Sequence, residues 1–590
     1  MSGKEITYFK LNSKPKSFSL RQNMKKFNWT LYRPEAASVK ALSESINVSA
    51  PIATALLGRG VSNFQEAKAF FRPNLDMLHS PFLMKDMKKA SGRVLQAVRN
   101  GEKILIYGDY DVDGTTGTAM LVLFLKKLGA NVAYYVNDRH SEGYGISSSG
   151  IAKAKDEQTD LVISVDCGIS AVEPVRFCNE HGIDFIICDH HEPSDLPDAY
   201  AILNPKLPDS GYPYRELCGC GVAFKLIQAV ASLVEIAPAE VYAYLDYVAL
   251  AIAADIVNLT GENRVMMAEG LKTIQCRPRQ CLAVMSKVCG LDLSNVSSSQ
   301  IVFSIAPRIN AAGRLNHARQ AIEWMIAEDE HEAVALAEEL EFVNRERREI
   351  DTETFKEAEQ LAEVYALNYA SSIVLYKDSW HVGVIGIVAS RILEKYYRPT
   401  LILTAADGVL KGSARSVQGV NVYEALQACE EFLLQFGGHE HAAGLTLAPS
   451  NLESFRKAFD RAVEEQFTIE MRVPEIKVDA EVVLEQITPN FFKVLSQFAP
   501  FGPKNPRPVF LTRNVKLCSL PQLLKEKHLK FSICDALGRR FDVVGFNMPE
   551  YFKPLQTPDR RISLVYSLTE NVWNRRTSIQ IRLRDLSFED

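Results

Sequence analysis

The chain has 590 residues, which is too long for one hydrophobic core and predicts three or four domains. Its hydrophobic content of 47% and charged content of 24% lie in the range of ordinary soluble globular proteins. The polar, basic first residues do not resemble a secretory signal. The most apolar helical stretch, residues 242–257, contains Asp246 and Asp255, which argues against a membrane span. We therefore expect a cytoplasmic protein without a membrane-spanning part.

The net charge of −5 hides an uneven distribution along the chain. From Met471 to the end there are 19 Lys and Arg against 13 Asp and Glu, a net of +6, which leaves −11 for the preceding residues. A basic region attracts phosphate, and an acidic body suits metal chemistry. Chance variation in surface charge explains this feature equally well when it is taken alone.

Residues 1–85 predict a helical lead-in, with helix-like segments at 36–58 and 63–71. Over residues 86–320, short apolar runs alternate with helix-length segments such as Thr118–Leu128. The apolar runs are Ile104–Tyr107, Val132–Val136, Leu161–Val165, Phe185–Cys188 and Ala201–Leu203. This alternation predicts an α/β domain with a mostly parallel sheet covered by helices on both faces. Ligands of such sheets collect at the carboxyl ends of the strands.

A charged stretch without Pro or Gly, residues 321–367, predicts one long helix that connects two domains. Residues 368–468 predict a smaller α/β domain, with Gly-rich strand–loop–helix edges at KGSARS and FGGHEHAAG. Residues 469–590 contain short alternating strands, which predict an all-β module of the small-barrel type.

A loop with three carboxylates follows the first apolar run. The sequence GDYDVDGTTG places Asp109, Asp111 and Asp113 in one tight turn before a helix. Carboxylates so close together repel one another unless a cation is bound. A solvated turn or a helix N-cap is the alternative explanation of this loop by itself.

Further acidic and imidazole side chains follow the next elements: Asp166 after LVISV, the triplet Asp189-His190-His191 after FIIC, and Asp255 at the end of an almost entirely apolar helix. Each alone would be explained as a capping aspartate or a satisfied core histidine, but together they meet at one edge of one sheet. An oxygen-rich set with one or two imidazoles and no thiolate favours Mn²⁺ or Mg²⁺ over Zn²⁺. The ligands suffice for two ions about 4 Å apart, which would activate a water and stabilise the leaving oxygen of a phosphodiester. Asp166 is the expected bridging ligand.

These segments resemble the motifs of the DHH phosphoesterase superfamily, whose name is the triplet at 189–191. Within it the chain is most similar to the RecJ family of single-strand-specific exonucleases, over nearly its whole length. The matching segments are GDYDVDGTTG, VDCGIS, CDHH, AADIV, EGYGIS, PRINAAGRL, WHVGVIGIVASR, GSARS, GGHEHAAG, PFGPKNPRPVF and ENVWNRR. The resemblance implies a parallel-sheet DHH domain, a smaller DHHA1 domain joined to it by the long helix, and an OB-like barrel.

The resemblance also implies stepwise 5′-to-3′ removal of mononucleotides from single-stranded DNA with Mn²⁺ or Mg²⁺, in DNA repair and recombination. The implied metal ligands are Asp109, Asp111, Asp113, Asp166, His190 and Asp255. The implied catalytic residues are Asp166, His190 and His191, the last as a ligand or by stabilising charge on the phosphate. The implied phosphate-binding residues are Arg139, Arg308, Ser413, Arg415 and His439. For Arg308 and Arg415, a structural salt bridge is the alternative.

Two positions depart from the family pattern, because Lys504 and Arg575 stand where glycine is expected, and both add positive charge to the basic region. Two other functions stay open. A DHH-family oligoribonuclease or dinucleotide phosphodiesterase would share the ligands but lack the residues after Met471, and a non-catalytic DNA-binding relative would have lost the metal site. We expect single-stranded DNA as the ligand and a monomeric protein. The family resemblance adds a helicase and a single-strand-binding protein as partners.

Overall fold

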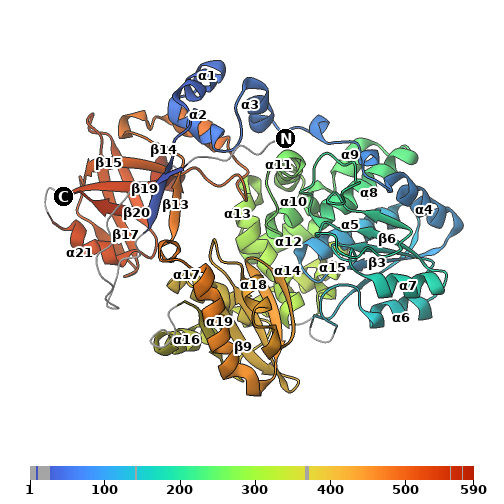
Figure 1. Ribbon diagram of the computed structural model, residues 1–590. Coiled ribbons are helices and arrows are strands. Elements are labelled where there is room, and N and C mark those ends of the chain that lie inside the picture. Colours follow the sequence, from blue (N-terminus) through green and yellow to red (C-terminus); the bar gives the residue numbers. More distant parts are fainter. Residues whose placement is uncertain are drawn as a thin grey trace.

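The computed structural model describes residues 8–10, 27–139, 142–315, 317–365, 371–557, 560–573 and 576–589. It contains an N-terminal segment with three helices, two α/β domains and a C-terminal β module (Figure 1). Within the described ranges, no helix combines the length and apolar character needed to cross a membrane.

The first α/β domain is built on five parallel strands in the order β4-β3-β5-β6-β7. The strands are β3 (Lys103–Gly108), β4 (Asn131–Val136), β5 (Leu161–Val165), β6 (Asp184–Cys188) and β7 (Ala201–Leu203). One face is covered by α5 (Val112–Lys127), α8 (Gly219–Leu233) and α10 (Leu245–Ala254), the other by α6 (Ser148–Asp156) and α7 (Val172–Glu180). Along β3, Ile104 and Ile106 join the first core, whereas Leu105 and Tyr107 join the second. The predicted parallel sheet with helices on both faces is confirmed.

Further helices extend this domain on the side that faces the C-terminal module (Figure 1). They are α11 (Gly261–Cys276), α12 (Gln280–Cys289), α13 (Ser298–Gln300) with the π-helical turn η4 (Ile301–Ile305), and α14 (Ala306–Leu315).

The predicted connecting helix is in fact two helices, α15 (Arg319–Ile326) and α16 (Glu330–Tyr365). The backbone is extended at Ala327, and the Asp329 side chain accepts a hydrogen bond from the Glu332 N–H (3.0 Å), which starts the second helix. The prediction of one helix from 321 is therefore wrong at its start, and residues 366–367 lie outside the described ranges. The 36 residues of α16 span about 54 Å. This helix joins the two domains because its early residues lie in the core of the first and its last residues in the core of the second.

The second α/β domain has five strands in the order β11-β12-β10-β9-β8, of which β8 and β9 are parallel. The strands are β8 (Ile373–Tyr376), β9 (Thr400–Ala406), β10 (Val409–Arg415), β11 (Leu433–His439) and β12 (Ala442–Leu447), with helices α17 (Ile385–Tyr396), α18 (Val422–Gln427) and α19 (Leu452–Gln466). KGSARS covers the end of β10, which leads through residues 416–421 into α18 as predicted. GGHEHAAG instead forms the β11–β12 hairpin, so the predicted strand–loop–helix edge is wrong there. Glycine fits within a strand here because a Cβ on Gly412 would lie 2.6 Å from Cδ2 of Leu403 on the neighbouring strand.

The C-terminal module is a seven-stranded sheet in the order β14-β15-β19-β20-β18-β17-β16. The strands are β14 (Ala480–Glu481), β15 (Phe510–Lys516), β16 (Gln522–Leu524), β17 (His528–Cys534), β18 (Arg540–Gly545), β19 (Arg561–Trp573) and β20 (Arg576–Phe588). A bridge between Leu517 and Ile533 and a hydrogen bond from the Cys518 N–H to the Ser532 carbonyl (2.8 Å) join the end of β15 to β17. The sheet therefore curves around its own core, and the predicted β module is confirmed, although it also contains the short helices α20 (Pro489–Ser496) and α21 (Phe552–Leu555). Cys518 and Cys534 form a disulfide.

The N-terminal segment packs on the C-terminal module, beside which Figure 1 shows its helices in blue. The helices α1 (Ala36–Ile46), α2 (Ala50–Leu57) and α3 (Phe64–Phe71) lie in the predicted helical ranges. The lead-in is not wholly helical, however, because β1 (Tyr8–Lys10) and β2 (Asn28–Tyr32) form a three-stranded sheet with β13 (Glu475–Val478). The two ends of the chain thus share one structural unit.

Candidate metal centre and phosphate cleft

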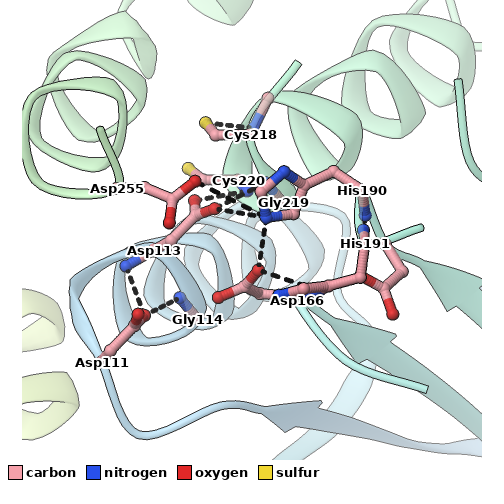
Figure 2. Close-up of polar contacts among 12 residues, drawn as sticks. Asp111, Asp113, Gly114, Asp166, His190, His191, Cys218, Gly219, Cys220 and Asp255 are labelled. Carbon is pink, nitrogen blue, oxygen red and sulfur yellow. Dashed lines mark hydrogen bonds and ion pairs between the residues drawn. The ribbon is translucent and has the colours of Figure 1, made fainter. Parts of the chain in front are cut away.

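The carboxyl edge of the parallel sheet gathers the acidic and imidazole side chains (Figure 2). Asp109 follows β3, Asp166 follows β5, and His190 lies two residues beyond β6. Asp255 is the C-cap residue of α10. Because the strands are parallel, their ends deliver these residues to one place.

The ligand atoms form three overlapping groups, within each of which they lie no more than 4.8 Å apart. His190 is at the centre: its Nε2 lies 3.1 Å from Asp166 Oδ1, 3.5 Å from Asp255 Oδ2 and 3.8 Å from Asp113 Oδ2. The groups contain Asp109, Asp111, Asp113, Asp166, His190, His191 and Asp255. Every residue predicted as a metal ligand is therefore brought together with the others.

The cluster is largely buried, and the negative charges of its aspartates repel one another. Burial, together with the neighbouring aspartates, raises the pKa of Asp166 well above its usual range, that of Asp113 to about 7 and that of Asp255 to about 9. Buried polar atoms without a hydrogen-bond partner include Asp109 Oδ1, Asp166 Oδ1, His190 Nε2 and Asp255 Oδ2. Oxygen-rich ligands left unsatisfied in this way fit hard divalent cations such as Mn²⁺ or Mg²⁺.

The backbone at the cluster is adapted to close packing. Asp166 adopts a left-handed φ of 63°, a conformation that is costly for a side chain and is typical of functional sites. A Cβ on Gly219 would lie 2.6 Å from Asp166 Cβ, so only glycine fits at the start of α8. The Gly219 N–H donates to Asp113 Oδ2 (2.6 Å) and the Cys220 N–H to Oδ1 (2.8 Å), which fixes this carboxylate. Asp111 caps α5 by accepting from the Asp113 N–H (2.8 Å), so the N-cap explanation is correct for this residue, which also belongs to one of the three ligand groups.

The two histidines differ in protonation. Burial and the nearby His191 lower the pKa of His190 to about 3, so this imidazole is neutral and free to coordinate. Despite burial, the hydrogen bond to Asp189 raises the pKa of His191. Asp189 Oδ1 accepts this bond from His191 Nδ1 (2.7 Å), and its Oδ2 accepts from the Ile169 N–H (2.9 Å). Asp189, the first letter of the triplet, therefore orients His191 rather than joining the ligand groups.

Tyr144 was not predicted as a site residue. Its hydroxyl lies 3.2 Å from both ring nitrogens of His191. It belongs to the segment EGYGIS, which resembles a family motif. The sequence does not predict its contact with His191, because a single tyrosine in a loop carries no pattern that identifies its partner.

A cleft of about 870 Å³ lies between the two α/β domains. Arg139 and Arg314 line it from the first domain, and Ser413 and Arg415 line it from β10 of the second. Burial and the nearby Arg139 lower the pKa of both Arg415 and Arg314, the latter to about 10. The Arg139 guanidinium lies 5.0 Å from the ring centroid of Tyr110, which places it beside the acidic loop. Cations that repel one another in a partly buried cleft favour binding of an anion such as phosphate.

Two predicted phosphate contacts do not line this cleft. Arg308 is buried, and its Nε lies 2.6 Å from Glu341 Oε2 on α16, so the salt-bridge alternative is favoured for this residue. His439 is exposed at the end of β11, and its neighbour Gly438 lines the cleft in its place. Arg314, six residues after Arg308 on the same helix, is the cleft residue that was missed.

Three family models match this chain. The "DHH family, N-terminal domain" matches residues 103–252, the "DHHA1 domain" residues 368–465 and the "RecJ OB domain" residues 478–585. The metal cluster lies in or beside the first match, and Ser413 and Arg415 lie in the second.

Relatives and solved structures agree with these models. The single-stranded-DNA-specific exonuclease RecJ of Bacillus subtilis is 37% identical over 569 residues, 96% of this chain and 71% of that protein. The Escherichia coli protein of the same name is 33% identical over 546 residues, 89% and 93% of the two chains. RecJ of Thermus thermophilus in complex with Mn²⁺ superimposes with a TM-score of 0.82 at 29% identity, over 95% of this chain and 80% of that one. The chain therefore belongs to the RecJ family of the DHH superfamily.

Proposed function

We propose that the chain is a divalent-metal-dependent exonuclease that degrades single-stranded DNA from the 5′ end to mononucleotides, in DNA repair and recombination. The observation that carries the proposal is the largely buried cluster of five aspartates and two histidines close to an arginine-lined cleft. The names of the relatives from Bacillus subtilis and Escherichia coli support single-stranded DNA as the substrate.

The cluster would hold two Mn²⁺ or Mg²⁺ ions through Asp109, Asp111, Asp113, Asp166, His190 and Asp255. Bound cations would neutralise charge at the scissile phosphate and activate a water for attack. His190 is neutral, which leaves its Nε2 lone pair available. Ionised Asp189 keeps a proton on His191 Nδ1 and so holds this imidazole in one orientation, from which it would stabilise charge on the phosphate.

The cleft would bind the terminal phosphate of the strand. Arg139, Arg314 and Arg415 supply fixed positive charge, and the Ser413 hydroxyl lies 2.9 Å from Arg415 Nη1. A terminal phosphate held in this cleft would present the next phosphodiester to the metal cluster, which gives stepwise removal of single nucleotides. The basic C-terminal module favours a polymer over a dinucleotide, and the complete ligand set argues against a non-catalytic relative.

We also propose that the protein acts in the cytoplasm as a monomer. Association with a helicase and a single-strand-binding protein stays a prediction from the family resemblance.

Digestion of end-labelled oligonucleotides tests the proposal. With Mn²⁺ or Mg²⁺, label should leave the 5′ end of a single strand before the 3′ end, the matching duplex should stay intact, and EDTA should stop the reaction. Release of the 3′ label first, or full activity in EDTA, would overturn it.

A further inference from the structure

An apolar groove of about 200 Å³ lies between the end of α10, the turn η4 and residues 501–503 of the C-terminal module. Its lining consists of apolar side chains, glycine, proline and two serines. The largest of these are Ile252, Ile256, Leu259, Met267, Phe303 and Phe501. The groove thus has one wall on the first α/β domain and one on the C-terminal module.

Two side chains of the groove are exposed although they are large and apolar. Ile256 is 76% exposed and Phe303 is 74% exposed. Ile256 has a φ of 60°, a left-handed conformation that is strongly disfavoured for a β-branched residue. Phe303 lies in a π-helical turn, an element that is common at functional sites. The fold therefore carries backbone strain where it holds an apolar surface open to solvent.

The groove adjoins the metal cluster and has a fixed shape. Ile256 directly follows Asp255, one of the cluster residues. The opposite wall is held in place because the Leu259 N–H donates to the Pro503 carbonyl (2.9 Å) and the Ser298 hydroxyl donates to the Phe501 carbonyl (2.7 Å). A ligand in this groove would therefore be bound by a preorganised surface next to the site of hydrolysis.

Cations flank the apolar surface. Exposed Lys504, in a left-handed conformation with φ 59°, directly follows the turn that lines the groove. The Arg507 guanidinium lies 4.3 Å from the ring centroid of Phe501, and burial with the nearby Arg582 lowers the pKa of Arg507. This apolar groove bordered by cations is complementary to a nucleic-acid strand, whose bases are flat rings and whose phosphates are anions. An apolar peptide would fill the groove but would not supply anions for the flanking cations.

We propose that this groove binds nucleobases of the DNA strand by stacking on Phe303 and Ile256, outside the metal cluster. The inference rests on the proposed function and adds to it a second contact, which recognises bases rather than phosphates. Stacking is tolerant of base identity because every base has a π-face, so the groove would hold any sequence.

Kinetics of Phe303→Ala on two substrates test this site. The substrates are an oligothymidylate and a strand of equal length whose central nucleotides lack bases. Removing the ring should raise KM for oligothymidylate about ten-fold while kcat stays within about two-fold, and should leave KM for the abasic strand unchanged. Phe303→Trp should keep the wild-type KM. The matched control is Phe342→Ala, which removes another highly exposed phenylalanine (64%) from α16 and should change neither value.

Several outcomes would overturn the groove as a base site. One is an unchanged KM for Phe303→Ala, and another is an equal rise in KM on both strands. A third is a change in oligomeric state on gel filtration with no change in KM, which would assign the groove to a second copy of the chain. Failure of the proposed function would look different, because the unsubstituted protein would then leave oligothymidylate intact.

Discussion

Arg264 on α11 fastens the first α/β domain to the C-terminal module. Its side chain is 5% exposed and donates to the carbonyls of residues 498–500 at 3.0–3.2 Å and to that of Phe70 at 3.1 Å. Arg264→Met would keep the length of the side chain and remove every donor. Asn505 would still donate to the carbonyls of 498 and 500, so the part-buried bonds to the carbonyls of Phe70 and Ala499 would be the ones lost. At about 0.5–1.5 kcal/mol for each hydrogen bond lost, the variant should lose about 1–3 kcal/mol of coupling between the two units.

Scanning calorimetry of the full chain measures this loss. The C-terminal module of Arg264→Met should unfold in a separate transition at lower temperature, because the loss falls on the contact between the units. Arg93→Met is the matched control, since Arg93 is equally buried but pairs with Glu102 and Asp184 inside the first domain. It should destabilise that domain without separating the module. A calorimetric profile of Arg264→Met identical to that of the unsubstituted protein would show that Arg264 does not couple the two units.

Four further substitutions have specific expected outcomes. Arg415→Met should raise KM for a 5′-phosphorylated strand about ten-fold with little change in kcat. Arg308→Met should instead lower the free energy of unfolding and leave KM unchanged. The reverse pattern would contradict the assignment of the cleft. Gly219→Ala should lower kcat about 100-fold, because the new Cβ would displace Asp166, and wild-type turnover would contradict this. Burial raises the pKa of Asp585 from 3.8 to about 6 in the folded state, so this carboxyl destabilises the fold progressively as the pH rises from about 4 to above 6. Asp585→Asn should therefore stabilise the protein by about 2 kcal/mol more at pH 7.5 than at pH 4.5 in urea unfolding, and a pH-independent difference would count against the buried charge.

The metal cluster could be predicted from the sequence because its residues directly follow elements with clear periodicity. The run Leu161–Val165 is the strand β5 as predicted, and Asp166 takes its position from the end of that strand. Parallel pairing then brings it to His190 without further information. The position of a ligand in the fold can therefore be predicted from the local sequence pattern when the ligand lies within a few residues of a buried strand.

The phosphate contacts could not be predicted to the same degree. Arg308 and Arg314 lie on one helix, but Arg308 forms an ion pair with Glu341 of α16, which is distant in the sequence. The local sequence therefore does not show which of the two arginines lines the cleft. The pairing of β2 with β13 joins residues more than 400 positions apart, and no local signal encodes it. Lys504 adopts the left-handed conformation expected of the glycine that it replaces, so the turn geometry is kept, while Arg575 lies outside the described residues.

We expect the clustered carboxylates and imidazoles to bind two divalent cations that hydrolysis requires. Titration of the chain with Mn²⁺, followed by electron paramagnetic resonance of the free ion, counts the bound ions directly. We expect two bound ions per chain. Asp166→Asn should lose at least one of them together with exonuclease activity. Asp246→Asn should bind Mn²⁺ unchanged, because this buried carboxylate pairs with Arg279 instead (2.6 Å). Full Mn²⁺ binding by Asp166→Asn, or strand degradation by a chain that holds no Mn²⁺ or Mg²⁺, would contradict this expectation.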